Sequence, residues 1–185
     1  MRGTYVDIGC YHPRKHSNTY LFYKRGWSGI LVDVEKAKII ACRILRPRDT
    51  SLLKAVSDKN GQRTVYAPKK YSVVTSLSPL NPDYKAIGQI ECVTLTKILD
   101  EHLEDRPIDL LSIDVEGHDL QVLKGLDFSR YKPEVIVIES WAGNDIESIT
   151  QDEIHKILSG EGYNLIAWAG LSLIYRQAKT HSDSS

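Results

Sequence analysis

Five short apolar segments of the chain each run into an acidic residue, and this repeated pattern constrains the fold more than any other feature. The acidic ends are Asp7, Asp33, Asp58, the pair Asp114 and Glu116, and Glu139. Stretches with the apolar spacing of a helix separate most of these segments, as between Lys36 and Leu45. Strands that alternate with helices form a parallel sheet covered on both faces. The sequence therefore predicts an α/β fold.

The predicted strands of this sheet are rich in β-branched and aliphatic residues. They cover residues 4–8, 29–33, 52–56, 108–113 and 133–139. Between the first two strands, Ser17 or Asn18 is expected to cap a helix that runs to about Arg25, and Gly26 is expected to end it.

The middle of the chain carries weaker signals. A small extra strand is predicted at 63–67, after a turn at Asn60-Gly61. Residues 68–90 include Pro79 and Pro82, which predict a long loop. Loops of that length in compact domains often cover a site.

The C-terminal part is expected to close the sheet in a different way. Thr150 and Glu153 have the spacing of a capping box, which predicts the start of another helix. Segments 163–168 and 171–175 flank a turn at Ala169-Gly170, and they predict an antiparallel hairpin.

The composition fits a folded chain with a core of its own. A length of 185 residues favours one domain, predicted to span residues 1–176, with a polar tail at 177–185. The 24 Lys and Arg residues balance 24 Asp and Glu residues, so the chain lacks the net positive charge of a nucleic-acid partner. No apolar run approaches the ~20 residues of a membrane span.

The cysteines and the N-terminus bear on the cellular compartment. Cys10, Cys42 and Cys92 are odd in number and lack the spacing of a zinc or redox motif, which favours a reducing compartment. No signal-peptide-like apolar stretch follows the charged start. We therefore expect a cytoplasmic protein. The sequence leaves open whether the native chain extends upstream of Met1 and whether it forms a homodimer.

The strand ends also indicate where a ligand would bind. In an open parallel sheet, ligands bind outside the carboxyl ends of the strands. Gly9 would let a ligand approach the backbone of the first loop, and Asp33 stands where an acid can accept both hydroxyls of a ribose. The loop at 10–16 lacks the further glycines of the dinucleotide fingerprint. A nucleoside cofactor with a smaller anionic group fits this loop better than NAD.

Several motifs together resemble the FkbM family of S-adenosylmethionine-dependent methyltransferases. They are Val6 to Pro13, Ser17 to Tyr20, Arg25 to Gly29, Ala55 to Asp58, Ile113 to Asp119 and Val122 to Gly125. The Ile-Asp-Val-Glu-Gly block followed by Val-Leu-Lys-Gly is the most specific part. The resemblance implies the class I, Rossmann-like methyltransferase fold, a three-layer sandwich around a mostly parallel seven-stranded sheet whose last strand is antiparallel.

The resemblance also implies roles for individual residues. The cofactor, S-adenosyl-L-methionine, would be held by Asp7 and Gly9 on its methionine side, by Asp33 at the ribose, and by Ser57 and Asp58 near the adenine. Asn18 is a further residue expected to bind the cofactor. Asp114 and Glu116 would face the methyl group and the acceptor. Two departures stand out. Pro13 occupies a place where many relatives carry a second glycine, and Asp33-Val34 replaces a common Glu-Pro.

Methyl transfer to a hydroxyl requires precise positioning and benefits from a general base. The candidates are His118, Glu116, Asp114 and His12. We favour His118 as the base, with Glu116 orienting it or the acceptor. His12 and Glu139 are further candidates for binding the acceptor. Alternatively, Asp114, Glu116 and Glu139 would hold a Mg²⁺ ion that polarises the acceptor.

The predicted function is therefore an S-adenosylmethionine-dependent O-methyltransferase. The resemblance implies that the acceptor is a sugar hydroxyl of a polysaccharide, a lipopolysaccharide or a glycolipid. Two alternatives remain open at this point: an NAD(P)-dependent oxidoreductase on a similar sheet, and a non-catalytic binding module that keeps the methyltransferase fold.

Overall fold

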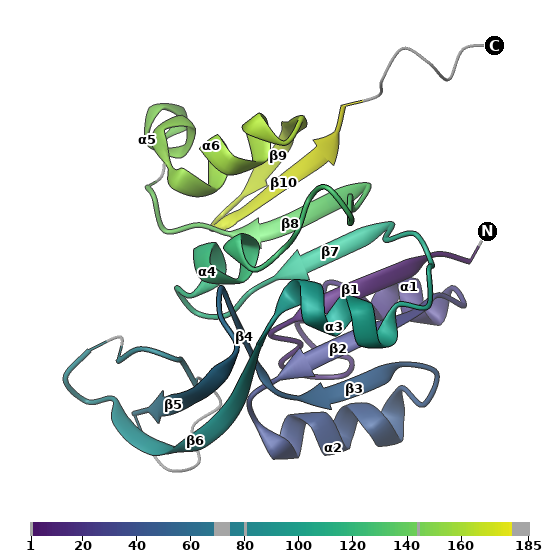
Figure 1. Ribbon diagram of the computed structural model, residues 1–185, viewed down its shortest axis with the longest axis vertical. Helices are drawn as coiled ribbons and strands as arrows, with labels where there is room; N and C mark the ends of the chain where they lie inside the picture. The colour runs from purple at the N-terminus through teal and green to yellow at the C-terminus, as the bar shows by residue number, and fades with distance from the viewer. Residues whose placement is uncertain (1, 69–74, 80, 144, 179–185) are drawn as a thin grey trace.

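The computed structural model describes residues 2–68, 75–79, 81–143 and 145–178. Its main sheet has seven strands in the order β3-β2-β1-β7-β8-β10-β9 (Figure 1). The strands are β1 Thr4–Ile8, β2 Ser28–Asp33, β3 Thr50–Leu53, β7 Leu110–Ile113, β8 Val135–Glu139, β9 Tyr163–Ala169 and β10 Ser172–Gln177. Neighbouring strands among β3, β2, β1, β7 and β8 pair in parallel, whereas β10 is antiparallel to both β8 and β9. The predicted α/β class and C-terminal hairpin are confirmed.

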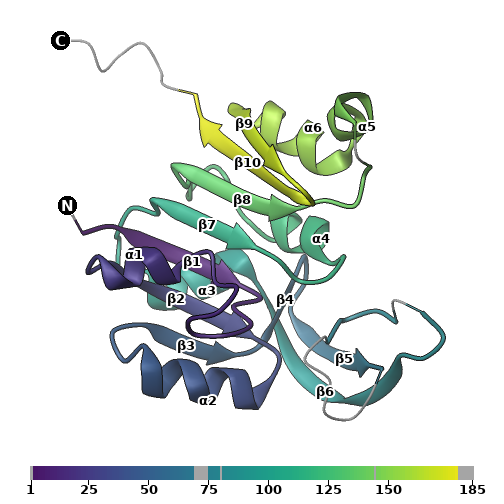
Figure 2. The same ribbon diagram turned by 180° about the vertical axis from the view of Figure 1, so that it is seen from behind.

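Helices lie on both faces of this sheet (Figures 1 and 2). One face carries α3 Leu95–His102, α4 Asp119–Lys124, α5 Ile146–Gln151 and α6 Glu153–Gly160, and the other carries α1 Tyr20–Lys24 and α2 Lys36–Leu45. These layers confirm the three-layer arrangement. In the described part of the chain, no helix combines the length and the apolar character needed to cross a bilayer.

Burial on both faces explains why the central strands are almost continuously apolar. In β1, Val6 and Ile8 pack against the α3 side of the sheet, whereas Tyr5 packs against the α1 and α2 side. In β2, Ile30 and Leu31 divide between the two faces in the same way. Each such aliphatic side chain contributes about 1.5–3 kcal/mol when it is fully buried.

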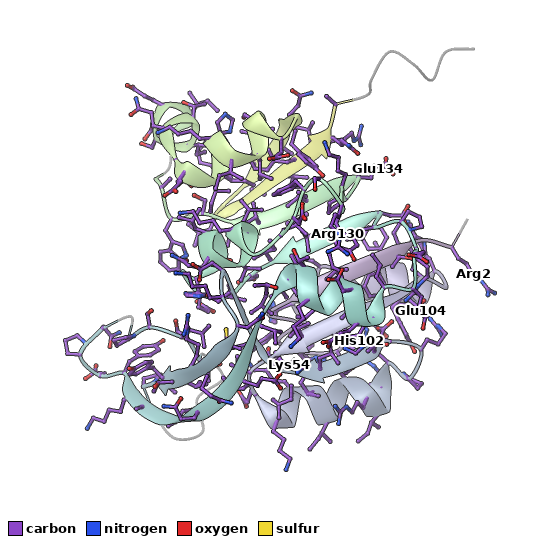
Figure 3. The ribbon with its side chains drawn as sticks, in the orientation of Figure 1. Arg2, Lys54, His102, Glu104, Arg130 and Glu134 are labelled. Atoms are coloured by element: carbon purple, nitrogen blue, oxygen red, sulfur yellow. The ribbon has the colours of Figure 1, made fainter. Side chains whose placement is uncertain are left out.

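The strand predicted at 52–56 is in fact two strands in two sheets. β3 belongs to the main sheet, and β4 Ala55–Ser57 belongs to a three-stranded sheet with the order β4-β6-β5. Lys54 lies at the crossing, where Figure 3 labels it, and its Nζ contacts Glu91 Oε2 at 2.7 Å. The prediction was wrong because an apolar run does not show where the chain changes its pairing partner.

The second sheet also corrects the predicted loop at 68–90. β5 Gly61–Ala67 pairs antiparallel with β6 Lys85–Thr94, so residues 85–90 are a strand. Most side chains of this part of β6 are exposed, which leaves no apolar alternation to predict a strand from. Residues 69–74 and 80 of the predicted loop lie outside the described residues.

β5 and β6 together form an arm that extends past the carboxyl ends of the main sheet (Figure 2). The extra strand predicted at 63–67 is β5, which begins earlier, at Gly61. The Asn60-Gly61 turn does not close a hairpin with the preceding strand, because β6 lies between β4 and β5. Asn60 instead accepts a hydrogen bond from the backbone N–H of Thr94.

Three helix boundaries differ from the prediction. The N-cap of α1 is Thr19 rather than Ser17 or Asn18. Thr150 lies inside α5, a helix that was not predicted. Asp145 caps α5 by accepting the N–H of Ser148, and α6 then starts after Asp152.

Residues 179–185, most of the predicted tail, lie outside the described residues, and Gln177 still belongs to β10.

A buried arginine ties α1 and the end of α2 to the sheet. Arg46 is 0% exposed, and its Nε donates to Asp49 Oδ2 at 2.7 Å. Its other nitrogens donate to Ser17 Oγ at 3.2 Å and to Thr19 Oγ1 at 3.0 Å. Thr19 in turn donates to Asp7 Oδ2 at 2.6 Å. Asp49 also accepts from the hydroxyl of Tyr5, so the cluster connects strand, helix and loop.

Replacing Arg46 with Ala is expected to lower the free energy of unfolding by about 3–5 kcal/mol, because Asp49 would remain buried with its charge unpaired. Urea unfolding monitored by circular dichroism measures the change. Arg43→Ala is the matched control, since Arg43 lies on α2, is exposed and, among the described residues, bonds only the carbonyl of Ser51. A loss of similar size in both variants would contradict the role assigned to Arg46.

Candidate functional site

A cavity of about 310 Å³ opens at the carboxyl ends of β1, β2 and β7. This is the point where the strand order reverses, because β1 connects to β2 on one side and lies beside β7 on the other. The cavity is lined by Ile8, Gly9, Tyr11, His16, Val32, Asp33, Val34, Lys38, Lys54, Val56, Thr75, Ser76, Leu77, Asp114, Val115 and Glu116.

The loop after β1 touches the loop after β7 at the floor of this site. Gly9 has a φ of +84°, and a Cβ placed on it would lie 1.7 Å from the carbonyl oxygen of Asp114. The N–H groups of Gly9 and Cys10 both donate to the carbonyl of Val32, at 2.9 and 3.1 Å. Gly9 is therefore required by packing of the protein backbone as well as by any ligand in the cavity.

Asp33 lies in the cavity, as predicted from its place at the end of β2. Its Oδ2 accepts from the N–H of Tyr11 at 3.1 Å, and its Oδ1 accepts from the N–H of Glu35 at 2.9 Å. Lys38 Nζ is 3.6 Å from Asp33 Oδ2 and lies over the ring of Tyr11. A carboxylate has about four acceptor positions, so Asp33 retains capacity for a ligand.

Asp7 and Asn18 were expected to bind the cofactor, but neither lines the cavity. Asp7 is buried at the base of α1, where it accepts from Thr19, and it does not line the cavity. Burial raises the pKa of Asp7 to about 6, and the nearby Asp114 and Asp33 charges add to this shift. Asn18 is exposed, and its Nδ2 donates to Ser112 Oγ at 3.0 Å.

The loop between β7 and α4 carries the acids that face the cavity. Asp114 and Glu116 both line it, and burial raises the pKa of each. Glu116 has a φ of +55°, a left-handed conformation that is uncommon for a residue with a Cβ. Such strained residues persist only where the surrounding structure holds them, and they concentrate at functional sites.

Asp119 holds this strained loop, a role that was not predicted from the sequence. It is 2% exposed, and its two carboxylate oxygens accept from the N–H groups of Val115 at 3.0 Å and Gly117 at 3.1 Å. The two donors are the residues directly before and after Glu116, so the hydrogen bonds fix the backbone on both sides of it. An acid placed two residues after the glycine of a strand-to-helix turn was the signal that could have identified it.

His118 lies next to the cavity but does not line it. Its Nε2 is 2.9 Å from Ser57 Oγ, and Ser57 donates to Asp58 Oδ1 at 3.0 Å. Burial lowers the pKa of His118. The structure thus brings His118 together with Ser57 and Asp58, a contact that was not predicted; none of the three lines the cavity, whereas the adjoining Val56 does.

The remaining predicted residues differ in how close they lie to the site. Glu139 ends β8, and its pKa is raised by burial and by the charges of Asp114 and Glu116, so it belongs to the same acidic region. His12 Nδ1 accepts from the N–H groups of Arg14 and Lys15, which folds its ring back onto its own loop.

The structure gives no support to the Mg²⁺ hypothesis. Among the residues that the structure describes, no group of three or more His, Cys, Asp or Glu side chains is arranged to hold a metal ion.

Residues from distant parts of the chain complete the cavity and were not predicted. Tyr11 and Lys38 border Asp33, whereas Lys54 and Ser76 come from the crossing between the sheets and from the segment after β5. Ser76 also donates to the carbonyl of Glu116 at 3.3 Å. Contacts of this kind follow from tertiary pairing, which no local motif records.

Comparison with known proteins identifies the family and the fold of the chain. The family model described as the Methyltransferase FkbM domain matches residues 7–165. The chain belongs to this family. A crystal structure of the methyltransferase FkbM from Methylobacillus flagellatus KT has the same fold, with a TM-score of 0.59 and 16% sequence identity. The match covers 95% of this chain and 43% of the other. Among curated proteins, none matches the chain significantly.

The pKa of Asp119, raised by burial to about 7 from an ordinary 3.8, predicts a dependence of stability on pH. The folded state binds this proton more tightly than the unfolded state, so Asp119 lowers stability as pH rises through that interval. The free energy of unfolding of Asp119→Asn should therefore increase relative to that of the wild type between pH 5 and pH 8, by on the order of 2 kcal/mol.

Urea unfolding at several pH values measures this difference. Asp127→Asn is the control, because Asp127 is partly exposed and its pKa is lowered by hydrogen bonds from Ser129. A difference between Asp119→Asn and wild type that stays constant with pH would refute the buried, proton-retaining state of Asp119.

Proposed function

We propose that the protein transfers a methyl group from S-adenosyl-L-methionine to a hydroxyl oxygen, and that the acceptor is a sugar of a polysaccharide, a lipopolysaccharide or a glycolipid. Membership of the FkbM methyltransferase family supports the reaction class. The strained Glu116, held toward the cavity by Asp119, is the single observation that supports this site most strongly.

The residues that line the cavity fit this cofactor chemically. Asp33 offers a carboxylate to a ribose diol, as acids do at the end of the second strand of related sheets. Apolar side chains such as Val56 and Leu77 offer a surface for a flat base. Asp114 can bind an ammonium group, and the Lys38 amine can bind a carboxylate. When bound, the cofactor would supply an electrophilic methyl group on a positively charged sulfur.

The acidic lining also favours a cationic donor. Asp114 and Glu116 lie in the cavity and Glu139 lies close by, so a positive sulfonium gains electrostatic attraction that the neutral product would not have. This difference would help the product to leave after transfer. The alternative of an NAD(P)-dependent oxidoreductase has no such support, and the loop after Gly9 lacks further glycines.

The general base is assigned here to Glu116 rather than to His118. Glu116 lines the cavity, and its raised pKa brings a carboxylate closer to the range in which a base is effective. His118 is hydrogen-bonded to Ser57 outside the cavity lining and is positioned to support the loop. Glu139 is proposed to bind the acceptor, and His12 stays a prediction.

Glu116→Gln is expected to bind S-adenosylhomocysteine like the wild type but to slow methyl transfer by about 10²- to 10⁴-fold, the usual contribution of a general base. Mass spectrometry of a sugar panel, scored for the gain of one methyl group, measures transfer. His118→Ala provides the comparison. A larger loss of kcat in His118→Ala than in Glu116→Gln would return the role of base to His118.

Asp33→Asn is expected to weaken binding of S-adenosylhomocysteine by about 10- to 100-fold, because a charge-assisted hydrogen bond contributes roughly 1.5–3 kcal/mol. Isothermal titration calorimetry measures the affinity. The control is Asp109→Asn, since Asp109 also accepts a backbone N–H, that of Thr4, but at the opposite end of the strands. Equal affinities in wild type and Asp33→Asn would contradict the assignment of Asp33.

A further inference from the structure

Trp141 lies directly after β8, two residues beyond the acidic Glu139, and exposes 61% of its surface. Ile113 of β7 pairs with Ile138 of β8, so Glu139 lies next to Asp114, an acid that lines the cavity, and Trp141 follows at the same edge of the sheet. A single exposed apolar side chain is ordinary on a protein surface. The contacts of Trp141 with its neighbours distinguish it from such a side chain.

The indole of Trp141 is held by its polar end. Its Nε1 donates to Glu139 Oε2 at 3.0 Å. The one hydrogen-bond donor of the side chain is therefore used within the protein, and the two faces of the ring are what remains for contact with a ligand. The bond engages one carboxylate oxygen of Glu139, and a carboxylate can accept further hydrogen bonds.

The backbone on both sides of Trp141 is fixed. Ser140 is buried, its N–H donates to the carbonyl of Leu171 at 2.9 Å, and its hydroxyl donates to Asp152. The N–H of Ala142 donates to Ser140 Oγ at 3.2 Å. A ring held in this way loses little conformational entropy when it binds a ligand.

The chemistry around the ring narrows the ligand. Carboxylates at Glu139, Glu116 and Asp114 repel anions and accept hydrogen bonds from hydroxyl groups. A flat indole face suits a ring with an apolar face. An uncharged sugar ring has both properties, since its C–H groups form an apolar face and its hydroxyls lie around the edge.

We propose that Trp141 is the platform of an acceptor subsite, on which the C–H face of an uncharged sugar ring stacks while Glu139 accepts hydrogen bonds from its hydroxyls. The proposal rests on the proposed function and deepens it. It adds the residue that binds the acceptor ring, and it selects neutral sugars over uronic acids.

Tryptophan emission during titration with methyl glycosides and with the corresponding uronic acids tests the subsite directly. Neutral glycosides are expected to change the emission of the wild type and of Trp168→Phe, but not that of Trp141→Phe. Trp168 is the matched control because it is also exposed and donates its Nε1–H to a backbone carbonyl, that of Gly170. It pairs with Leu173 and so lies on the other face of the sheet from Glu139, which pairs with Ser172.

Kinetics with the best acceptor of the panel provide the second measurement. Trp141→Ala is expected to raise KM by about tenfold or more and to change kcat little, since the ring binds the acceptor before and during transfer alike. Trp168→Ala should leave both constants unchanged. Glu139→Gln should narrow the preference for neutral over acidic sugars, because it removes a repulsive charge.

The proposal is overturned if no neutral glycoside changes the emission up to its solubility limit, if the change persists in Trp141→Phe, or if uronic acids bind more tightly than neutral sugars. Failure of the proposed function would look different. It would leave the wild type unable to bind S-adenosylhomocysteine, while the emission titration with glycosides requires no cofactor.

Discussion

The loops that follow β1 and β7 meet at a separation that only a glycine permits, and the whole candidate site depends on this contact. A side chain at Gly9 would place its Cβ on the carbonyl of Asp114. Because the strand order reverses between β1 and β7, the two loops diverge above this point and leave the cavity between them. Asp33 then reaches the cavity from β2, and Glu116 reaches it from the β7 loop.

The acids at this edge are buried at an electrostatic cost that the fold offsets with specific hydrogen bonds. Thr19 donates to Asp7, and two backbone N–H groups donate to Asp119. Burial nevertheless raises the pKa of both groups. Under the proposed function, the same negative region attracts a sulfonium donor and disfavours anionic acceptors. A chain with no net charge can therefore contain a largely acidic strand-end edge, since most of its 24 basic residues lie outside the cavity, which Lys38 and Lys54 line.

The prediction that the strand ends mark the site identified the correct edge of the sheet. It did not identify which residues at that edge line the cavity. Asp33, Gly9, Asp114 and Glu116 line the cavity, whereas Asp7 and His118 do not. A strand end places a residue at an edge, but the side chain points to one face or the other according to its register. Asp7 pairs with Ser112 and points toward α1, into the cluster of Arg46. The sequence contains no local signal for that choice.

The amino-acid pattern alone determined the alternation of strands and helices and the antiparallel hairpin, because these features depend on local propensity and periodicity. It also marked the acidic ends of β1, β2, β7 and β8, whereas Asp58 follows β4 of the second sheet rather than a strand of the main sheet. The tertiary structure decided what depends on pairing between distant segments. It divided residues 50–57 between two sheets, made 85–90 a strand of the arm, and brought Ser76 to the carbonyl of Glu116. The folded chain also decided which local contacts form: Trp141 donates to Glu139, two residues before it, and keeps its ring exposed. Burial and hydrogen bonding of this kind are properties of the folded chain, so they cannot be obtained from spacing along the sequence.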